Sequence, residues 1–455
     1  MKKKIVYFLI AAVCLSGCTA DYLDKKPSKS LVVPTSMVHL QALLDGVSNS
    51  MNTAPGIQVL ATDEFYHPES NLANIPFLDR NSYTWAKDIF EGNGVRDWEY
   101  PYKQIFNANI VLDGLSKISR DPSNAKDWDQ LQASALFYRA NALFNLAQVF
   151  AAPYDPSTAS ALPGIPVRLS MDVNETVGRG TLQQTYDRII GDLIEAETKL
   201  PAQVSYINRP SQPAVTALLA RIYLSMRDYD KATEMASRCL QLHTKLLDYN
   251  TLTPSAARPL PAPFSGENPE IIFYSTLQSY STIVNSALSG VDSVLFKTYD
   301  ADDLRRSCYF VARANGLFGY KGSYVNAVTL FGGLTTSEVY MIRAEGYARQ
   351  NKTGLALADL NTVLAKRFKT GKLVAVNSTP ENILDLVLLE RRKELFARGL
   401  RWSDLRRLNK EPEHAITIKR IFASSELTLP ANDSRYVFPI PDDEIRSSGI
   451  EQNPR

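Results

Sequence analysis

The sequence predicts a mostly α-helical (all-α) fold, in which TPR-like helical hairpins form a scaffold that carries an irregular, loop-rich variable region. Two segments repeat one spacing of small and apolar residues: Ala220, Tyr223, Ala232 and Leu240, then Ala344, Tyr347, Ala356 and Leu364. Each segment predicts a helix, a short turn and a second helix at the spacing of a tetratricopeptide hairpin. Such hairpins bury their apolar faces by stacking on one another. The alternative is a chance likeness between two unrelated amphipathic hairpins.

Helical periodicity extends beyond the repeat and is the second observation that favours this fold class. Apolar and small residues within 131–149 step by three or four positions, which places them on one face of a helix. Thr181 and Gln184 have the spacing of a capping box, as do Thr335 and Glu338, so each pair predicts the N-terminus of a helix. The alternation that is typical of β-strands is scarce throughout.

The domain organisation follows from where the helical patterns stop. Five prolines within 254–269 interrupt helix formation. We therefore predict one helical domain over 35–455, with a framework of about 35–250 and 334–455 and a variable insertion of about 251–333. Long loops on a rigid scaffold are where binding residues are usually found, so the insertion is the first place to look for a ligand site.

The N-terminal residues predict an export signal and a lipid anchor. Lysines at positions 2–4 precede an eleven-residue apolar run over 5–15. A membrane-spanning helix needs about 20 apolar residues, so this run has the length of a signal-peptide core instead. The run leads into small residues and Cys18, which resemble a bacterial lipobox. We predict a signal peptide over 1–17, acylation of Cys18 with palmitate among the chains, and a lipid anchor and tether over 18–34.

Cysteine usage agrees with a tethered, exported protein. Acyl chains hold a protein at a membrane without spanning it. An ordinary secretory peptide that happens to contain a cysteine is the alternative to the lipobox. Of the four cysteines, Cys14 would leave with the signal peptide and Cys18 would carry lipid. Cys239 and Cys308 lie in apolar surroundings, and two buried free thiols are favoured over a disulfide between them.

Charge gives no reason to propose a nucleic-acid partner. The chain has 50 Lys and Arg against 48 Asp and Glu, a net charge of +2. The most basic segment, 391–407, interleaves its charges with apolar side chains. This pattern favours an amphipathic segment that packs on the core and pairs its guanidinium groups with carboxylates, rather than a patch that binds nucleic acid.

A search for catalytic motifs finds little. None of the four histidines has metal-ligand spacing with another, and no paired-cysteine, serine-elbow or phosphate-loop motif occurs. Asp63-Glu64 and Asp442-Asp443-Glu444 could each supply half of a glycosidase pair, but solvated turns or helix caps are favoured. We predict no catalytic residue, no enzyme activity, no metal site and no cofactor. The sequence leaves open whether the fold holds a structural calcium ion.

Aromatic side chains are the better indication of a ligand site. Tyrosine and tryptophan combine an apolar face with a polar edge, which suits the C–H faces and hydroxyl rims of sugars and also suits peptides. Two aromatic clusters fall in irregular segments, near residues 65–85 and 280–324. The candidate ligand-binding residues are Tyr66, Tyr83, Trp85, Tyr280, Phe318, Tyr320 and Tyr324. Packing in the core is the alternative for each of them.

Six blocks of residues form the most specific pattern in the sequence. They read CTADYLD at 18–24, LATDE at 60–64, Trp98, Tyr102, Ile105 and Asn109, TTSEVY at 335–340 with Arg343 and Glu345, ERRKEL at 390–395 with Gly399, Arg401, Trp402, Asp404 and Leu405, and FPIP at 438–441 with Glu444, Ile445, Asn453 and Pro454. Together they resemble the SusD/RagB family of nutrient-binding outer-membrane lipoproteins of Bacteroidetes. The resemblance runs from the lipobox to the C-terminus.

The resemblance implies a lipoprotein at the cell surface, anchored in the outer membrane, that binds oligosaccharides and passes them to a SusC-like TonB-dependent transporter. A peptide-binding receptor of the RagB type is one alternative, and a TPR adaptor or transporter lid without a ligand of its own is another. A surface glycan hydrolase is the remaining rival, and the missing catalytic signature argues against it. Binding loops vary within the family, so the resemblance transfers regions and not individual binding residues.

Overall fold

The computed structural model describes residues 35–46, 51–284, 288–314 and 316–455. The predicted signal peptide, the lipidation site at Cys18 and the tether lie outside these residues. Among the helices described, none combines the length and the apolar character needed to cross a bilayer.

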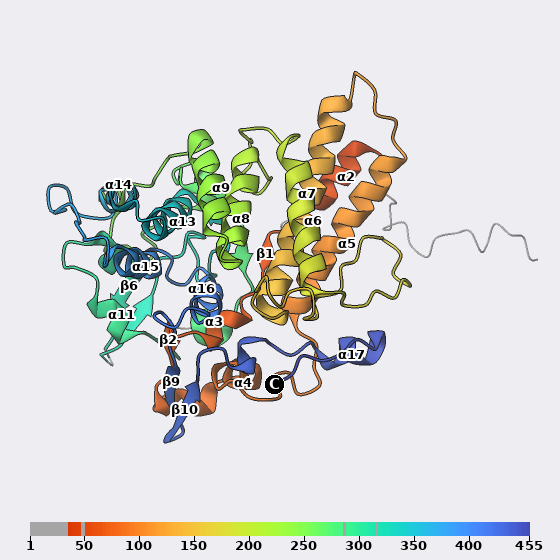
Figure 1. Cartoon of the computed structure of the whole chain (residues 1–455). Coiled ribbons are helices and arrows are strands. Elements are labelled where there is room, and N and C mark those ends of the chain that lie inside the picture. The colour runs from red at the N-terminus through yellow and green to blue at the C-terminus, as the bar shows by residue number, and fades with distance from the viewer. Residues whose placement is uncertain (1–34, 47–50, 285–287, 315) are drawn as a thin grey trace, which may run out of the picture.

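A row of helices forms the framework of the fold (Figure 1). These helices are α2 (Met37–Leu44), α5 (Arg96–Ser116), α6 (Ala125–Phe150), α7 (Leu182–Glu197), α8 (Gln212–Ser225), α9 (Tyr229–Leu242), α13 (Thr336–Arg349), α14 (Thr353–Leu364), α15 (Ile383–Glu394) and α16 (Arg401–Leu408). Neighbours from α5 to α9 pack in chain order, and α13 continues the row by packing against α9, α14 and α15. The prediction of a mostly helical fold with TPR-like hairpins is confirmed.

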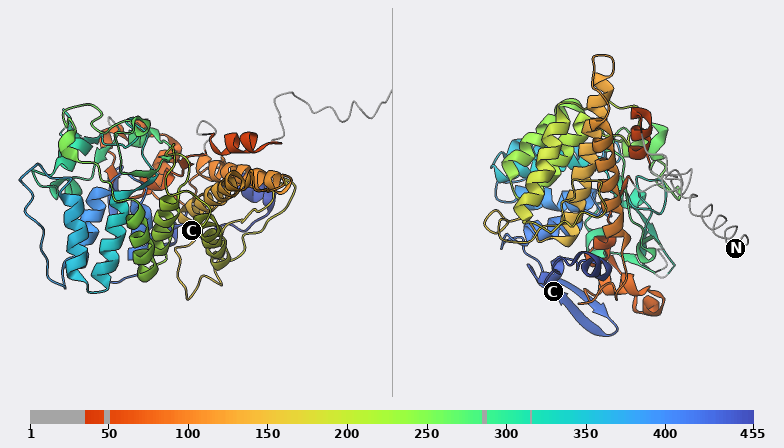
Figure 2. Two further views of the ribbon diagram at one scale, coloured as in Figure 1. Left: turned by 90° about the horizontal axis from the view of Figure 1, so that it is seen from above. Right: turned by 90° about the vertical axis from the view of Figure 1, so that its right-hand side faces the viewer.

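The chain leaves this row after α9 and returns to it at α13, so residues 243–335 form a loop-rich layer. Seen from above, this layer lies along one side of the framework helices (Figure 2). Its elements are η4 (Tyr249–Thr251), η5 (Pro263–Ser265), β3 (Ile271–Phe273), β4 (Thr276–Leu277), α10 (Ser281–Val284), β5 (Gly290–Val291), α11 (Ser293–Lys297), α12 (Leu304–Tyr309), β6 (Phe310–Ala312), β7 (Phe318–Tyr320) and β8 (Leu334–Thr335).

Short strand pairs fasten this layer to the N-terminal part of the chain. The remaining short elements are β1 (Thr53–Ala54), α3 (Ile57–Ala61), β2 (Phe65–Tyr66), η3 (Glu69–Asn74), α4 (Phe77–Tyr83), β9 (Ile418–Phe422), β10 (Ser425–Leu429), η6 (Ser434–Tyr436) and α17 (Asp442–Ser448). β1 pairs with β4 in parallel, while β2 with β5, β3 with β8, β6 with β7, and β9 with β10 are antiparallel. The β9–β10 hairpin projects from the body of the protein (Figure 1).

The two predicted hairpins are α8–α9 and α13–α14. The four alanines at the repeated positions, 220, 232, 344 and 356, are completely buried. The residues that end the first helix of each hairpin also correspond, because Arg227 (φ 64°) and Asn351 (φ 58°) both adopt the left-handed conformation. Each lies seven positions after the first alanine of its repeat. The repeat therefore fixes the turn as well as the packed faces.

Of the two predicted capping boxes, one forms completely and the other forms only in part. Thr181 and Gln184 form a complete capping box at the start of α7. Thr335 caps α13 through the backbone N–H of Glu338 at 3.4 Å, but the Glu338 carboxylate does not reach back. It accepts two hydrogen bonds from Arg221 instead, at 2.7 and 2.6 Å. This ion pair ties α13 to α8, so a tertiary contact replaces half of the local motif.

Replacing Gly346 with valine is expected to lower the free energy of unfolding by about 2 kcal/mol, because overpacking forces packed elements apart. A Cβ atom at 346 would lie 1.7 Å from Oγ1 of Thr233, so α13 approaches α9 too closely for a side chain. Gly354→Ala in α14 is the control, since no atom would lie within 4 Å of its Cβ. The control should stabilise by about 0.5–1 kcal/mol. Urea titrations of the two variants measure the contrast, and equal effects would contradict the close approach.

The basic segment 391–407 faces inward and pairs with carboxylates, as the sequence favoured. Arg391 and Arg407 both contact Asp404, each at 2.9 Å. Arg401 binds Asp63 at 2.7 Å, across 338 positions of the chain. These pairs neutralise much of the charge of the segment through tertiary contacts, as expected for a segment that packs on the core.

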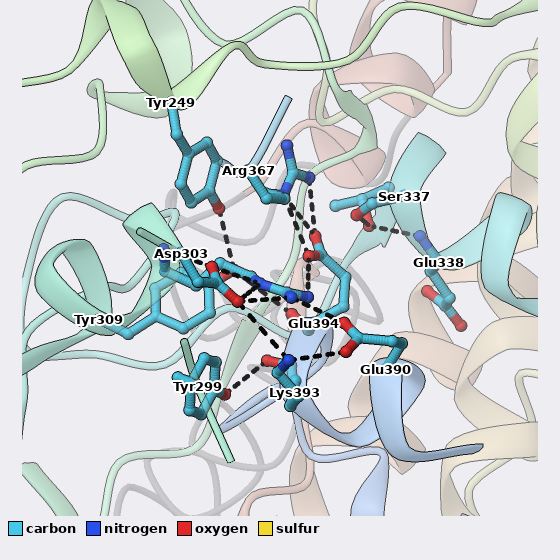
Figure 3. Close-up of polar contacts among 12 residues, drawn as sticks. Tyr249, Tyr299, Asp303, Tyr309, Ser337, Glu338, Arg367, Glu390, Lys393 and Glu394 are labelled. Carbon is cyan, nitrogen blue, oxygen red and sulfur yellow. Dashed lines mark hydrogen bonds and ion pairs between the residues drawn. The ribbon is translucent and has the colours of Figure 1, made fainter. Parts of the chain in front are cut away.

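A second, fully buried group of charges joins the insertion to the framework (Figure 3). Two arginines, 305 and 367, have no exposed side-chain surface. The ion pairs are Arg305 with Asp303 (2.8 Å), Glu390 (2.7 Å) and Glu394 (3.2 Å), and Arg367 with Glu270 (3.0 Å) and Glu394 (2.7 Å). Glu394 on α15 is shared by both arginines, so it connects the two halves of the network.

Cys239 and Cys308 are buried free thiols, and the favoured prediction is confirmed. Burial raises the pKa of Cys239 to about 12 and that of Cys308 to about 11. Both side chains therefore remain protonated and pack as small apolar groups.

Candidate ligand-binding groove

A groove of about 550 Å³ opens where the insertion meets the β9–β10 hairpin. Strand β2 and helix α11 contribute to one side of it, and β9 contributes to the other. Its lining includes Asp63, Tyr66, Asp292, Val294, Arg392, Lys419 and Ile421. A volume in this range is typical of ligand sites. We refer to these seven residues as the Tyr66 groove.

Tyr66 is held at the edge of the groove by the β2–β5 strand pair. It lies opposite Gly290, and a Cβ atom at that glycine would come within 2.7 Å of the tyrosine ring. The absence of a side chain at 290 therefore lets the ring lie against the backbone of β5. Tyr66 is half-buried, so part of its surface remains available to a ligand.

A charged bridge lies beside this tyrosine. One nitrogen of Arg392, Nη2, donates to Asp63 at 3.0 Å and to Asp292 at 2.9 Å, while Nε has no partner among the described residues. Burial alone would raise the pKa of Asp63, but Arg401 and Arg392 overcome that effect and hold it below its ordinary value. The groove therefore places two carboxylates and a guanidinium group next to an aromatic ring. Such a set can bind hydroxyl groups.

Three of the seven predicted aromatic residues are partly accessible, and neighbouring elements carry them. They are Tyr66 on β2 and Phe318 and Tyr320 on β7, and β5 contacts both strands. Phe318 stacks on Phe296 of α11 with ring centroids 3.7 Å apart. Tyr320 donates its hydroxyl hydrogen to the carbonyl of Gly322 at 2.8 Å. The two sequence clusters thus meet in space, although Tyr66 alone among the three lines the groove.

Tyr83 and Trp85 belong to the core, and their prediction as an exposed stacking surface is wrong. Each is 2% exposed, and Arg420 lies over both rings at 3.8 and 4.3 Å. The Trp85 indole N–H donates to the carbonyl of Ala61 at 3.0 Å. A buried guanidinium from β9 therefore occupies the aromatic faces that a ligand would need.

Tyr280 and Tyr324 are also buried, at 7% and 0% exposure, which corrects the same prediction for them. Tyr280 donates its hydroxyl hydrogen to Asp97, whose carboxylate also accepts the N–H groups at the start of α3. Tyr324 donates to Glu270 at 3.1 Å, and Arg398 covers its ring at 3.5 Å. Both hydroxyl groups donate hydrogen bonds to buried carboxylates, and these bonds stabilise the scaffold.

From the sequence, the charged residues of the groove were not assigned to a ligand site, and the β9–β10 hairpin was not predicted. The signal for the hairpin is weak because its two turn residues, Ala423 (φ 48°) and Ser424 (φ 63°), adopt left-handed conformations without glycine or asparagine. The partners of Arg392 lie 329 and 100 positions away, so no local pattern could reveal them.

The two acidic clusters have different roles. Asp442 to Glu444 occupy the first turn of α17, where negative charge is favourable, although the N-cap is Pro441 and no side chain caps this helix. Glu64 is 2% exposed, so the expectation of a solvated turn at 63–64 is wrong. In the described part of the chain, Glu411, Glu413 and His414 place three possible metal ligands within 4.8 Å. The Glu411 carboxylate is already bound by Arg349 and Tyr229.

Comparisons with known proteins agree with this fold. Residues 21–224 match a family described as starch-binding and associating with the outer membrane, and residues 336–455 match the SusD family. SusD-like protein P2 from Formosa agariphila is 26% identical over 249 residues, which cover 52% of this chain and 46% of that protein. The match thus spans less than half of that relative.

Solved structures show the same architecture. A putative sugar binding protein from Bacteroides vulgatus superposes with a TM-score of 0.73 at 21% identity, covering 93% of this chain and 99% of that one. A SusD superfamily protein from Bacteroides thetaiotaomicron gives 0.73 at 21%, covering 92% and 100%. The fold agrees with the two family matches, one of which is described as starch-binding and associating with the outer membrane. The chain belongs to the SusD/RagB family.

Proposed function

We propose that this chain is a surface-exposed lipoprotein, acylated at Cys18, that binds oligosaccharides in the Tyr66 groove and delivers them to a SusC-like TonB-dependent transporter. The main support for this ligand site is the half-buried ring of Tyr66, which lines the same groove as the Arg392 guanidinium and the two carboxylates that it bridges. The ring offers an apolar face to a sugar, and the guanidinium and carboxylates offer donors and acceptors to its hydroxyls. The helical framework is the surface we assign to the transporter.

A binding screen with residues 19–455, which contain every described element, tests this proposal. Polysaccharides, oligosaccharides and peptides would be compared by affinity gel electrophoresis and calorimetry. A glycan that binds without release of products supports capture without chemistry. A peptide that binds instead keeps the receptor role and changes the ligand class. No binding to either panel favours an adaptor or transporter lid.

Tyr66→Ala is expected to weaken glycan binding at least about tenfold, equivalent to about 1.4 kcal/mol, with unchanged helical content. The matched control is Tyr206→Ala, since Tyr206 is 58% exposed and lies outside the groove. Calorimetry measures affinity and circular dichroism measures helical content. Equal affinity for the wild type and the Tyr66 variant would remove this groove as the ligand site.

A further inference from the structure

A second cavity, of about 220 Å³, lies at the C-terminal end of α6. It is formed by the segment after that helix, by the end of α16 and the residues that follow it, and by η6 with the residues on either side of it, together with the C-terminal residues. Its walls include Ala152, Leu162, Pro163 and Val437, so much of its surface is apolar. It shares no lining residue with the Tyr66 groove.

Arg406 brings a positive charge into this cavity without a carboxylate to balance it. The side chain is 3% exposed, and it donates to the backbone carbonyls of Gln148 and Ala151 at the end of α6. A helix C-terminus carries only about half a negative charge. Among the described residues, no carboxylate forms an ion pair with Arg406, and its Nε has no hydrogen-bond partner. Burial lowers the pKa of Arg406 to about 10, which reflects this missing partner.

Other basic groups add to the excess of positive charge. Lys410 also lines the cavity and forms no ion pair within the described part of the chain. Arg455, next to the wall, has unpartnered Nε and Nη1 atoms, and burial together with Arg435 lowers its pKa. Asp433 is a carboxylate in the lining, and it accepts hydrogen bonds from Arg435 at 2.8 and 2.9 Å. The cavity is therefore positively charged as a whole.

Two neutral donors complete the site. The side chains of Asn409 and Tyr436 lie next to each other in the lining, and the Nδ2 atom of Asn409 and the Tyr436 hydroxyl are buried with no other hydrogen-bond partner among the described groups. Burial raises the pKa of Tyr436 to about 12, partly offset by the adjacent Asn409, so the hydroxyl stays protonated and can donate. An acceptor with negative charge would satisfy these donors together with Arg406.

We propose that this cavity binds a small carboxylate with a compact apolar body. The carboxylate would occupy the end near Arg406, Asn409 and Tyr436, and the apolar body would lie against Leu162, Pro163 and Val437. An engineered apolar cavity of about 150 Å³ admits benzene, so the volume available here suits a molecule of the size of benzoate. This site is independent of the proposed oligosaccharide groove.

Fluorine NMR titrations of residues 19–455 with 4-fluorobenzoate and with 4-fluorobenzyl alcohol test the proposal. The two probes share size and shape and differ in charge. The carboxylate is expected to bind at least about tenfold more tightly, and its affinity should fall with added salt because charges are screened. Equal affinities for both probes, or no binding of 4-fluorobenzoate, would overturn the proposal.

Two variants assign the binding to this cavity. Ala152→Leu fills the space while leaving every charge in place, and it should abolish binding of 4-fluorobenzoate. Lys410→Gln removes a charge from the lining and should weaken binding at least about threefold. Arg446→Gln is the control, because Arg446 is exposed on α17 and does not line the cavity. Undiminished binding by a folded Ala152→Leu protein would place the probe elsewhere and contradict the site.

Discussion

Glu394→Gln is expected to lower the free energy of unfolding by about 3–5 kcal/mol, because it removes the shared carboxylate of a buried ion network. Glu394 has no exposed side-chain surface and accepts hydrogen bonds from both Arg305 and Arg367. Without its charge, Arg367 would retain Glu270, and Arg305 would retain Asp303 and Glu390. The lost pairing energy cannot be recovered from water, since Arg305, Arg367 and residue 394 have no exposed side-chain surface.

The measurement is a urea titration followed by circular dichroism, in which the midpoint should shift while the slope stays constant. Glu426→Gln provides the control. Glu426 pairs with Lys419 at 3.2 Å, but the two side chains are 52% and 64% exposed, so its loss should cost less than about 1 kcal/mol. Equal midpoints for the two variants would show that the network of Figure 3 does not stabilise the junction between insertion and framework.

The framework could be predicted because its determinants are local. Small residues at fixed spacing predict the hairpins at 220–240 and 344–364, and the left-handed residues at 227 and 351 follow the same spacing. The prolines within 254–269 fall inside the loop-rich layer, although the last helix before it already ends at Leu242. A helix–turn–helix unit needs little information from the rest of the molecule, so its pattern is visible in the sequence.

The ligand site could be predicted only in part, because exposure depends on residues far away in the chain. Tyr66 and Tyr83 look equivalent in the sequence and both reach the groove, yet Arg420, 337 positions from Tyr83, covers the Tyr83 ring and leaves it 2% exposed, while Tyr66 stays half-buried. The same holds for Tyr324, which Arg398 covers. Aromatic composition therefore indicates the region of a site, while tertiary cation–π contacts decide which rings remain available.

Glu64→Gln is expected to stabilise the protein at pH 8 by about 3 kcal/mol and to change little at pH 4.5. Burial raises the pKa of Glu64 from 4.5 to about 7, and the charge of Asp63 acts in the same direction. The folded state therefore holds a proton on Glu64 at pH values where the unfolded chain has released it. The contribution of this group to stability is complete below pH 4.5 and is lost as the pH rises through about 7.

Glutamine copies the protonated side chain, so the difference between variant and wild type isolates this titration. Its oxygen can still accept the backbone N–H of Ala397, which Glu64 accepts at 2.7 Å. Glu69→Gln is the matched control, because it makes the same substitution at an exposed position nearby in the chain. Melting temperatures of the three proteins measured from pH 4.5 to 8 give the result. A Glu64→Gln advantage that stays constant with pH would mean that Glu64 is already ionised in the folded protein, and that the turn at 397 tolerates a buried charge beside the groove.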